Sequence, residues 1–121
     1  MGEKRYAFPR SRRLSGKRAF AAVYATGAKQ ARGPLVVFTL ANGLAHCRWG
    51  LSVPRAVGTA VRRNRIKRLL REAIRLLQHD LPRGYDVIIV VRPHEPMILT
   101  EYQRLLSDLM VQGHAAQDKM S

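Results

Sequence analysis

The chain has 121 residues, with 22 lysines and arginines against 8 aspartates and glutamates, which gives a formal net charge of +14. Its single cysteine, Cys47, excludes an internal disulfide and fits a reducing compartment, so a cytoplasmic location is expected. No apolar run approaches the length of a membrane span, and the basic N-terminus lacks the apolar stretch of a secretory signal. The composition therefore predicts one domain with a modest core and a polyanion as its partner.

The positive charge is concentrated in two segments. Residues 1–33 contain nine basic residues and one acidic residue, and residues 55–75 contain eight and one. Residues 34–54 contribute a single arginine, and residues 76–121 are slightly acidic. A cationic surface built from an N-terminal and a central segment suits a chain of phosphates, and salt should weaken such binding steeply.

The N-terminal part of the chain predicts a basic arm followed by a short helix. Residues 1–14 are basic and irregular, and we expect them to form a flexible arm. Ser15 can cap a helix that runs to about Ala25 and ends at Gly27. The inward side of this helix would contain Phe20, Val23 and Tyr24.

Two strands are predicted next. Gly33-Pro34 opens a strand over residues 35–41, and Asn42-Gly43 is a turn signal after it. The second strand runs over about residues 46–53, because Pro54 prevents its simple continuation.

Residues 60–78 carry the most informative pattern in the chain. Thr59 is the expected N-cap of a long helix with an apolar face at i, i+3, i+4 and i+7 spacing. That face would contain Ile66, Leu69, Leu70, Ala73, Ile74 and Leu77. The opposite face collects Asn64, Lys67, Arg68, Arg71 and Arg75, with Glu72 as the one acid. Guanidinium groups at one-turn spacing suit repeating phosphates, so this face predicts a nucleic-acid surface rather than an ordinary solvated one.

The start of the same helix is unusually cationic. Arg62, Arg63 and Arg65 lie in its first turns, where the helix dipole disfavours positive charge. Folding alone would favour acids at these positions. An anionic partner would offset the cost, since the helix start also presents free backbone N–H groups.

The last part of the chain predicts a central strand and a final helix. The apolar run at residues 86–92 indicates a strand buried on both faces. Thr100 would cap the last helix, with Gln103 in capping-box position. Its core stripe would contain Tyr102, Leu105, Leu106, Leu109 and Met110, and the tail after Gly113 is expected to fray.

These elements predict an α+β fold of αββαβα type, a sandwich of three helices on a small mixed sheet. We divide the chain into the arm at residues 1–14, one RNA-binding domain at residues 15–113 and a frayed tail at residues 114–121.

No arrangement of residues predicts catalysis by the polypeptide. The four histidines show no metal-ligand spacing, and the acids are too scattered for the carboxylate cluster of a metal-dependent nuclease. No glycine-rich phosphate loop is present. We therefore predict that the polypeptide binds nucleic acid without cutting it, with no catalytic residue, no metal site and no small-molecule substrate of its own.

Three aromatic residues leave two interpretations open. Phe38 shares one face of its strand with Val36 and Leu40, and Phe20 and Tyr24 lie on the first helix. These rings form either core or the lining of a groove for single-stranded RNA, in which bases stack while phosphates meet cations.

Two alternative functions for the chain as a whole are a structural RNA-binding protein of the ribosomal type and a DNA-binding module. A membrane-surface helix is disfavoured, because the apolar face is needed for the core.

The chain resembles the bacterial ribonuclease P protein subunit, and residues 58–72 carry the resemblance most specifically. The centre of this signature is Arg63-Asn64-Arg65, followed by Lys67-Arg68 and Arg71-Glu72. Arg13-Leu14 with Phe20, residues 49–53 and residues 84–88 resemble other parts of the family in the same order. The resemblance covers about residues 10–110.

This resemblance implies a subunit of a ribonucleoprotein endonuclease that removes the 5′ leader of precursor tRNA in the bacterial cytoplasm. The catalyst would be the RNA with bound Mg²⁺, and the partners of the protein would be that catalytic RNA and the precursor tRNA. It also implies a sandwich with a left-handed βαβ crossover around the signature helix, like the second domain of ribosomal protein S5.

The resemblance and the cationic face together give two sets of expected site residues. The catalytic RNA would be bound by Arg62, Arg63, Asn64, Arg65, Lys67, Arg68, Arg71 and Arg75. A central cleft would hold the single-stranded leader through Arg13, Phe20, Tyr24, Val36 and Phe38.

Three positions depart from the family pattern. Pro54-Arg55-Ala56 offers one cation where the family usually has a basic pair, so contacts there should be weaker. Thr59 stands where Asn is common and still serves as a cap. Phe38 stands where Tyr can occur, which removes a hydroxyl but keeps the stacking surface.

Overall fold

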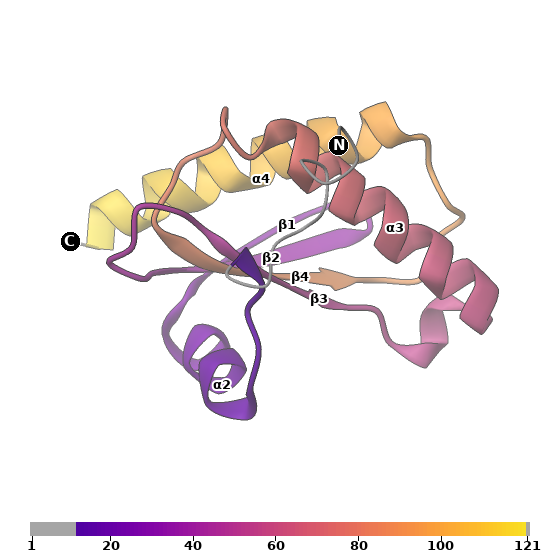
Figure 1. Cartoon of the computed structure of the whole chain (residues 1–121), viewed down its shortest axis with the longest axis horizontal. Coiled ribbons are helices and arrows are strands. Elements are labelled where there is room, and N and C mark those ends of the chain that lie inside the picture. Colours follow the sequence, from indigo (N-terminus) through magenta and orange to yellow (C-terminus); the bar gives the residue numbers. More distant parts are fainter. Residues whose placement is uncertain (1–11, 121) are drawn as a thin grey trace, which may run out of the picture.

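Residues 12–120 are described by a computed structural model, which also places the side chains of residues 12–117. Four strands form one mixed sheet in the order β1-β2-β4-β3, with α3 and α4 on one face and α2 on the other (Figure 1). The elements in chain order are α2 (Lys17–Thr26), β1 (Ala28–Arg32), β2 (Leu35–Ala41), β3 (Arg48–Ser52), the 3₁₀ turn η2 (Arg55–Val57), α3 (Ala60–Leu77), β4 (Tyr85–Val91) and α4 (Leu99–Met120). The predicted α+β class with three helices on a small mixed sheet is confirmed.

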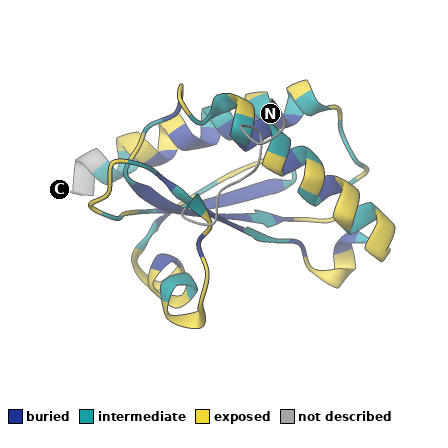
Figure 2. Cartoon of the chain, in the orientation of Figure 1, coloured by how far each residue is buried: buried dark blue, intermediate teal, exposed yellow. Residues whose placement is uncertain are grey.

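Strand β4 is the central strand, as its apolar run predicted. It pairs antiparallel with β2 and parallel with β3, so the β3-α3-β4 unit is a crossover around the long helix. Val87 and Ile89 are fully buried under α3 and α4, while Ile88 is fully buried on the α2 side. The sheet therefore lies between two apolar layers, visible as the dark interior in Figure 2.

Strand β1 was missed by the sequence analysis. Its sequence, Ala-Lys-Gln-Ala-Arg, contains no β-branched or aromatic residue, so local propensity gave no signal. It forms an edge strand because Gly33 and Pro34 make a tight reversal that places Arg32 opposite Leu35. Gly33 has a φ of 57°, a conformation that glycine adopts without strain.

The main core lies between the sheet and the helices α3 and α4. On α3, Ile66, Leu70, Ala73 and Ile74 are buried, and Leu69 and Leu77 pack against the same cluster. The predicted stripe of α4 is buried too, from Tyr102 to Met110. The apolar faces of both helices are thus used inside the domain.

The expected caps of α2 and α4 were wrong. The N-cap of α2 is Gly16 rather than Ser15, and no side chain caps this helix. Helix α4 begins at Leu99, so Thr100 lies inside its first turn. The end of α2 at Gly27 is as expected: a Cβ there would lie 2.5 Å from the Val23 carbonyl oxygen, which leaves no room for a side chain.

The domain also extends further at both ends than we expected. Leu14 is buried, and its N–H donates to the Trp49 carbonyl oxygen at 2.9 Å, so residues 12–14 belong to the domain; residues 1–11 of the predicted arm lie outside the described residues. Helix α4 does not end near Gly113 but continues to Met120. The reason is tertiary, since Gly113 packs against Thr39 and the Gln117 side chain donates to the Thr39 carbonyl oxygen at 2.8 Å.

Candidate nucleic-acid interface

The start of α3 is held by short-range polar contacts. As predicted, Thr59 is the N-cap, and its side-chain oxygen accepts a hydrogen bond from the Arg62 N–H at 3.2 Å. Arg63 donates through Nε to the Gly58 carbonyl oxygen at 3.1 Å. Arg62 pairs with Glu95, with 3.2 Å between Nη2 and Oε1. Two of the three cations at the start of α3, Arg62 and Arg63, therefore have partners within the chain, although Glu95 is 84% exposed and its pair with Arg62 is correspondingly weak.

Further along α3, the cations divide into paired and unpaired groups. Arg75 forms an ion pair with Glu72 one turn earlier, and this hydrogen bond lowers the pKa of the Glu72 carboxyl. Within residues 12–117, no hydrogen bond or ion pair engages the side chains of Arg65, Lys67, Arg68 and Arg71. These four cations remain available to an external anion.

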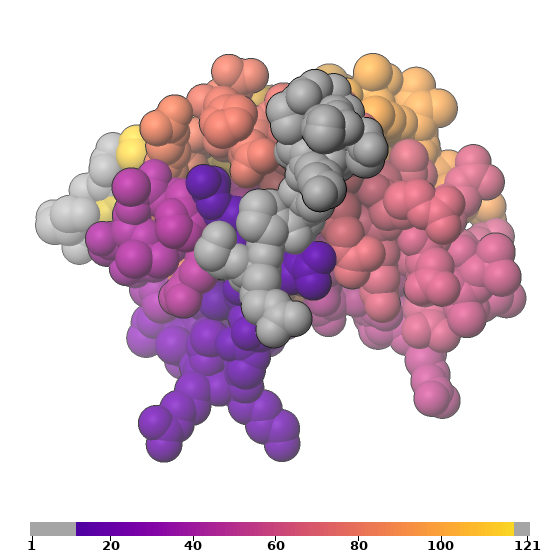
Figure 3. Space-filling view, in the orientation of Figure 1, coloured from indigo at the N-terminus to yellow at the C-terminus, as the bar shows by residue number. Residues whose placement is uncertain are grey.

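A pocket of about 440 Å³ lies beside α3, between the helix, strand β3 and the N-terminal segment. Lys67 and Arg71, one helical turn apart, line one side, and Arg13 contributes a third cation. The remaining lining is apolar: Leu14, Phe20, Trp49, Gly50 and Leu51. Figure 3 shows the outline of the molecule hollowed between α2 and the segment that leads into α3. Cationic and apolar side chains thus face one space, as a groove for single-stranded nucleic acid requires.

Glycine at position 50 shapes this pocket. A Cβ there would lie 2.6 Å from the Phe20 ring, so the ring can rest on β3 only because residue 50 has no side chain. Phe20 and Tyr24 have ring centroids 6.4 Å apart, and Tyr24 meets Phe38 edge to face at 4.9 Å. The three rings form a continuous aromatic row from the pocket to β2.

The question of core or groove for these rings has a mixed answer. Phe20 and Phe38 are half-buried, and both pack against the small cluster of Leu14, Val23 and Ile88. Tyr24 is 42% exposed. The rings therefore close the α2 side of the core with one edge and present another edge to solvent.

Of the expected leader-site residues, the structure brings Arg13 and Phe20 together with Lys67 and Arg71. Tyr24 and Phe38 continue the surface, whereas Val36 is 5% exposed and offers little area. The sequence analysis missed Lys29, whose Nζ lies 5.8 Å from the centre of the Phe38 ring. It could not have been found without β1, because the register of the β1–β2 hairpin sets Lys29 opposite Phe38.

Comparison with known proteins identifies the family of this chain. A sequence model of the ribonuclease P family matches residues 8–112. The chain belongs to the ribonuclease P protein family. It is 39% identical over 103 residues to the ribonuclease P protein component of Brevibacillus brevis, covering 84% of this chain and 82% of the relative. It is 37% identical to that of Desulfovibrio desulfuricans over 110 residues, covering 88% and 84%.

Solved structures of the family have the same fold. The RNase P protein from Thermotoga maritima superposes with a TM-score of 0.74 at 30% identity, covering 82% of this chain and 96% of that one. The RNase P protein of Staphylococcus aureus gives a TM-score of 0.73 at 30% identity, covering 83% and 93%. Among the described residues, no helix is long and apolar enough to cross a membrane.

The resemblance to the ribonuclease P family implies Mg²⁺, and the carboxylates of this chain do not fit a site for that ion. Among the side chains of residues 12–117, every acid except Asp80 pairs with an arginine, and no three potential ligands lie close enough to hold a metal. The paired acids are Glu72, Asp86, Glu95, Glu101 and Asp108. These acids therefore serve ion pairs within the protein.

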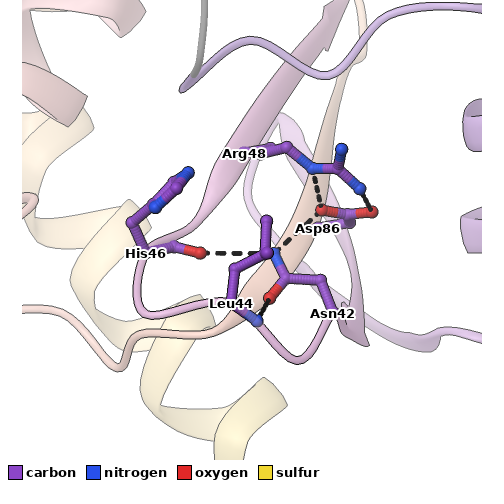
Figure 4. A network of polar contacts seen from close by, with 5 residues as sticks. All are labelled: Asn42, Leu44, His46, Arg48 and Asp86. Carbon is purple, nitrogen blue, oxygen red and sulfur yellow. Dashed lines mark hydrogen bonds and ion pairs between the residues drawn. The ribbon is translucent and has the colours of Figure 1, made fainter.

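The most buried of these acids, Asp86, fixes β3 against β4 on the α2 side of the sheet. Arg48 donates to both carboxylate oxygens, at 2.8 and 2.6 Å, and the Asn42 amide donates at 3.0 Å (Figure 4). Burial raises the pKa of Asp86, but the hydrogen bonds from Arg48 and Asn42 outweigh it and hold the pKa below its usual value. The network ties the edge strand β3, which lines the pocket, to the central strand.

Replacing Asp86 by Asn should lower the free energy of unfolding at neutral pH by about 1–3 kcal/mol, because Arg48 loses its bidentate partner. The folded carboxyl has the lower pKa, so its stabilisation exists above the unfolded pKa and is lost as pH falls through the folded value. The difference in free energy of unfolding between wild type and D86N, measured by urea denaturation, should therefore be largest near pH 7 and should shrink below about pH 4. An equal gap at both pH values would contradict this role for the carboxylate.

Proposed function

We propose that this chain acts as the protein subunit of ribonuclease P in maturation of tRNA 5′ ends. Its family membership and its pocket support this function, and the pocket is the observation that carries it. Unpaired cations of α3 and the Phe20 ring line one cleft, and Tyr24 and Phe38 continue the aromatic row from Phe20 toward β2. The cations bind phosphates of RNA, and the rings offer stacking surfaces for unpaired bases.

In this proposal the catalytic RNA contacts the exposed side of α3, through the residues of the signature. The single-stranded leader of the precursor tRNA lies in the cleft, with Phe20 and Tyr24 against bases and Arg13 near a phosphate. Mg²⁺ held by the RNA supplies the metal chemistry of hydrolysis. The protein contributes binding and position: its positive charge reduces repulsion between two RNAs and keeps the leader in register with the cleavage site.

The proposed function is tested by multiple-turnover processing of precursor tRNA at low Mg²⁺ by a bacterial ribonuclease P RNA, with and without this chain. We expect strong stimulation that requires the RNA, and no cleavage by the chain alone. Cleavage without the RNA would reveal an active site in the polypeptide. Absence of stimulation, with RNA binding retained, would favour a structural RNA-binding protein of the ribosomal type instead.

The double replacement of Phe20 and Phe38 by Ala should weaken binding of precursor tRNA to the holoenzyme by about tenfold or more, because stacking contributes about 1–3 kcal/mol per base. Binding of mature tRNA, which has no leader, should not change. The measurement is the dissociation constant of each tRNA from the assembled holoenzyme.

A matched control replaces Ile98 and Val111 by Ala, since both are exposed apolar residues outside the cleft. This control should bind both tRNAs as the wild type does. An equal loss for precursor and mature tRNA in the Phe20/Phe38 variant would exclude the leader site.

A further inference from the structure

A second, smaller pocket lies next to the cleft, at the N-terminal end of β3. Its volume is about 130 Å³, and Trp49 lines both cavities. Residues 12–14 run beside β3 at this point, with Arg13 bridged to Trp49, so that Arg12 lines the second pocket while Arg13 and Leu14 line the cleft. The walls of the second pocket come from the β2–β3 connection, the C-terminal end of α3 and the α3–β4 connection.

The lining of this second pocket is cationic. Arg12, His46, His79 and Arg83 surround it, with Gln78 and Cys47 beside them. No hydrogen bond or ion pair within residues 12–117 engages the side chains of those two arginines and two histidines. The two guanidinium groups around one small cavity repel each other, and the two imidazole rings beside them can donate N–H groups, so the arrangement favours an anion between them.

Other ligands suit the pocket less well. A metal ion is disfavoured by charge, and the described residues contain no set of three ligating side chains with suitable geometry. The Cys47 thiol already donates to the Pro82 carbonyl oxygen at 3.2 Å, and burial raises its pKa. The Asp86 carboxylate, which interacts electrostatically with His46, is occupied by Arg48 and Asn42. A cavity of this size holds a few water molecules, which is also room for one phosphate group.

We propose that this second pocket binds a backbone phosphate of RNA, through the guanidinium groups of Arg12 and Arg83 and the ring N–H groups of His46 and His79. The site lies on the same flank of α3 as the cleft, because Lys67 and Arg71 line one pocket and Gln78 and His79 line the other. From Arg71 to Gln78 the helix rises about 10 Å, which a few nucleotides span. RNA that leaves the cleft past the N-terminal segment therefore reaches a second anchor.

The test compares R83Q and the double variant H46Q/H79Q with the wild-type full chain. R92Q is the matched control, because Arg83 and Arg92 are both exposed and lie just before and just after β4. One arm measures binding to ribonuclease P RNA as a function of salt. The other measures binding of precursor tRNA with short and long leaders to the assembled holoenzyme. Thermal melting confirms that each variant is folded.

R83Q should lose about 3- to 10-fold in affinity and about one unit of salt slope in one arm, while R92Q matches the wild type. H46Q/H79Q should also bind RNA more weakly than the wild type in that arm, because the two imidazole rings are removed from the pocket. A loss in the first arm assigns the phosphate to the catalytic RNA, and a loss that depends on leader length assigns it to the precursor.

The proposal is overturned if R83Q behaves as R92Q does in both arms and H46Q/H79Q binds RNA as tightly as the wild type does. This inference rests on the proposed function only because the two RNAs used in the test are those of ribonuclease P. A wild-type chain that binds neither RNA would overturn the proposed function together with this inference. Normal assembly with unaffected pocket variants would overturn the inference alone.

Discussion

Replacing Lys67 and Arg71 together by Gln should weaken assembly with the ribonuclease P RNA by about 10- to 100-fold near 0.15 M salt, and should reduce the salt slope by about two units. Both side chains line the cleft, and neither has a hydrogen bond or ion pair within residues 12–117. Their loss therefore removes contacts to RNA and leaves the internal contacts of the protein unchanged. The same variant should also lose part of its preference for precursor over mature tRNA, since Arg13 and Phe20 share the pocket.

The control for this experiment removes the same charge elsewhere. Arg92 and Arg104 are exposed and line neither pocket, so R92Q/R104Q lowers the net charge equally. If the two double variants lose affinity to the same extent, RNA binding depends on total charge and not on the cleft. A salt titration of binding for both variants decides between these outcomes.

Replacing Gly50 by Ala should reduce the leader-dependent affinity by about tenfold, although Gly50 has no side chain that could itself contact RNA. The new Cβ would lie 2.6 Å from the Phe20 ring, so the ring must leave its place on β3 and move into the cleft. Overpacking of this kind also costs about 1–3 kcal/mol of stability. Binding of precursor and mature tRNA to the holoenzyme, together with urea denaturation, measures both effects.

Gly113→Ala is the matched control, because a Cβ there meets the Thr39 hydroxyl at 2.9 Å on the opposite side of the sheet. G113A should be destabilised to a similar degree while it keeps the preference for precursor tRNA. If both variants lose that preference, the loss reflects general destabilisation and not the position of Phe20.

The sequence by itself determined the parts of this protein that depend on local patterns. The period of α3, its Thr59 cap and its cationic side follow from residue spacing along one helix, and the structure confirms the helix and its buried face. The seven-residue strand β2 and the central place of β4 also follow from apolar runs and turn signals. The signature at residues 58–72 was sufficient to identify the family, because it is continuous in the chain.

Only the tertiary structure decided which residues share a cavity. Strand β1 exists because β2 offers it a partner, not because its own residues favour a strand. The helix α4 continues past Gly113 because Gly113 packs against Thr39 of β2. The cleft joins Arg13, Phe20, Gly50 and Lys67, and the second pocket joins Arg12, His46, His79 and Arg83. These residues are distant in sequence, and no local sequence pattern predicts that they lie together. Their proximity depends on the strand order and on the path of residues 12–14 along β3.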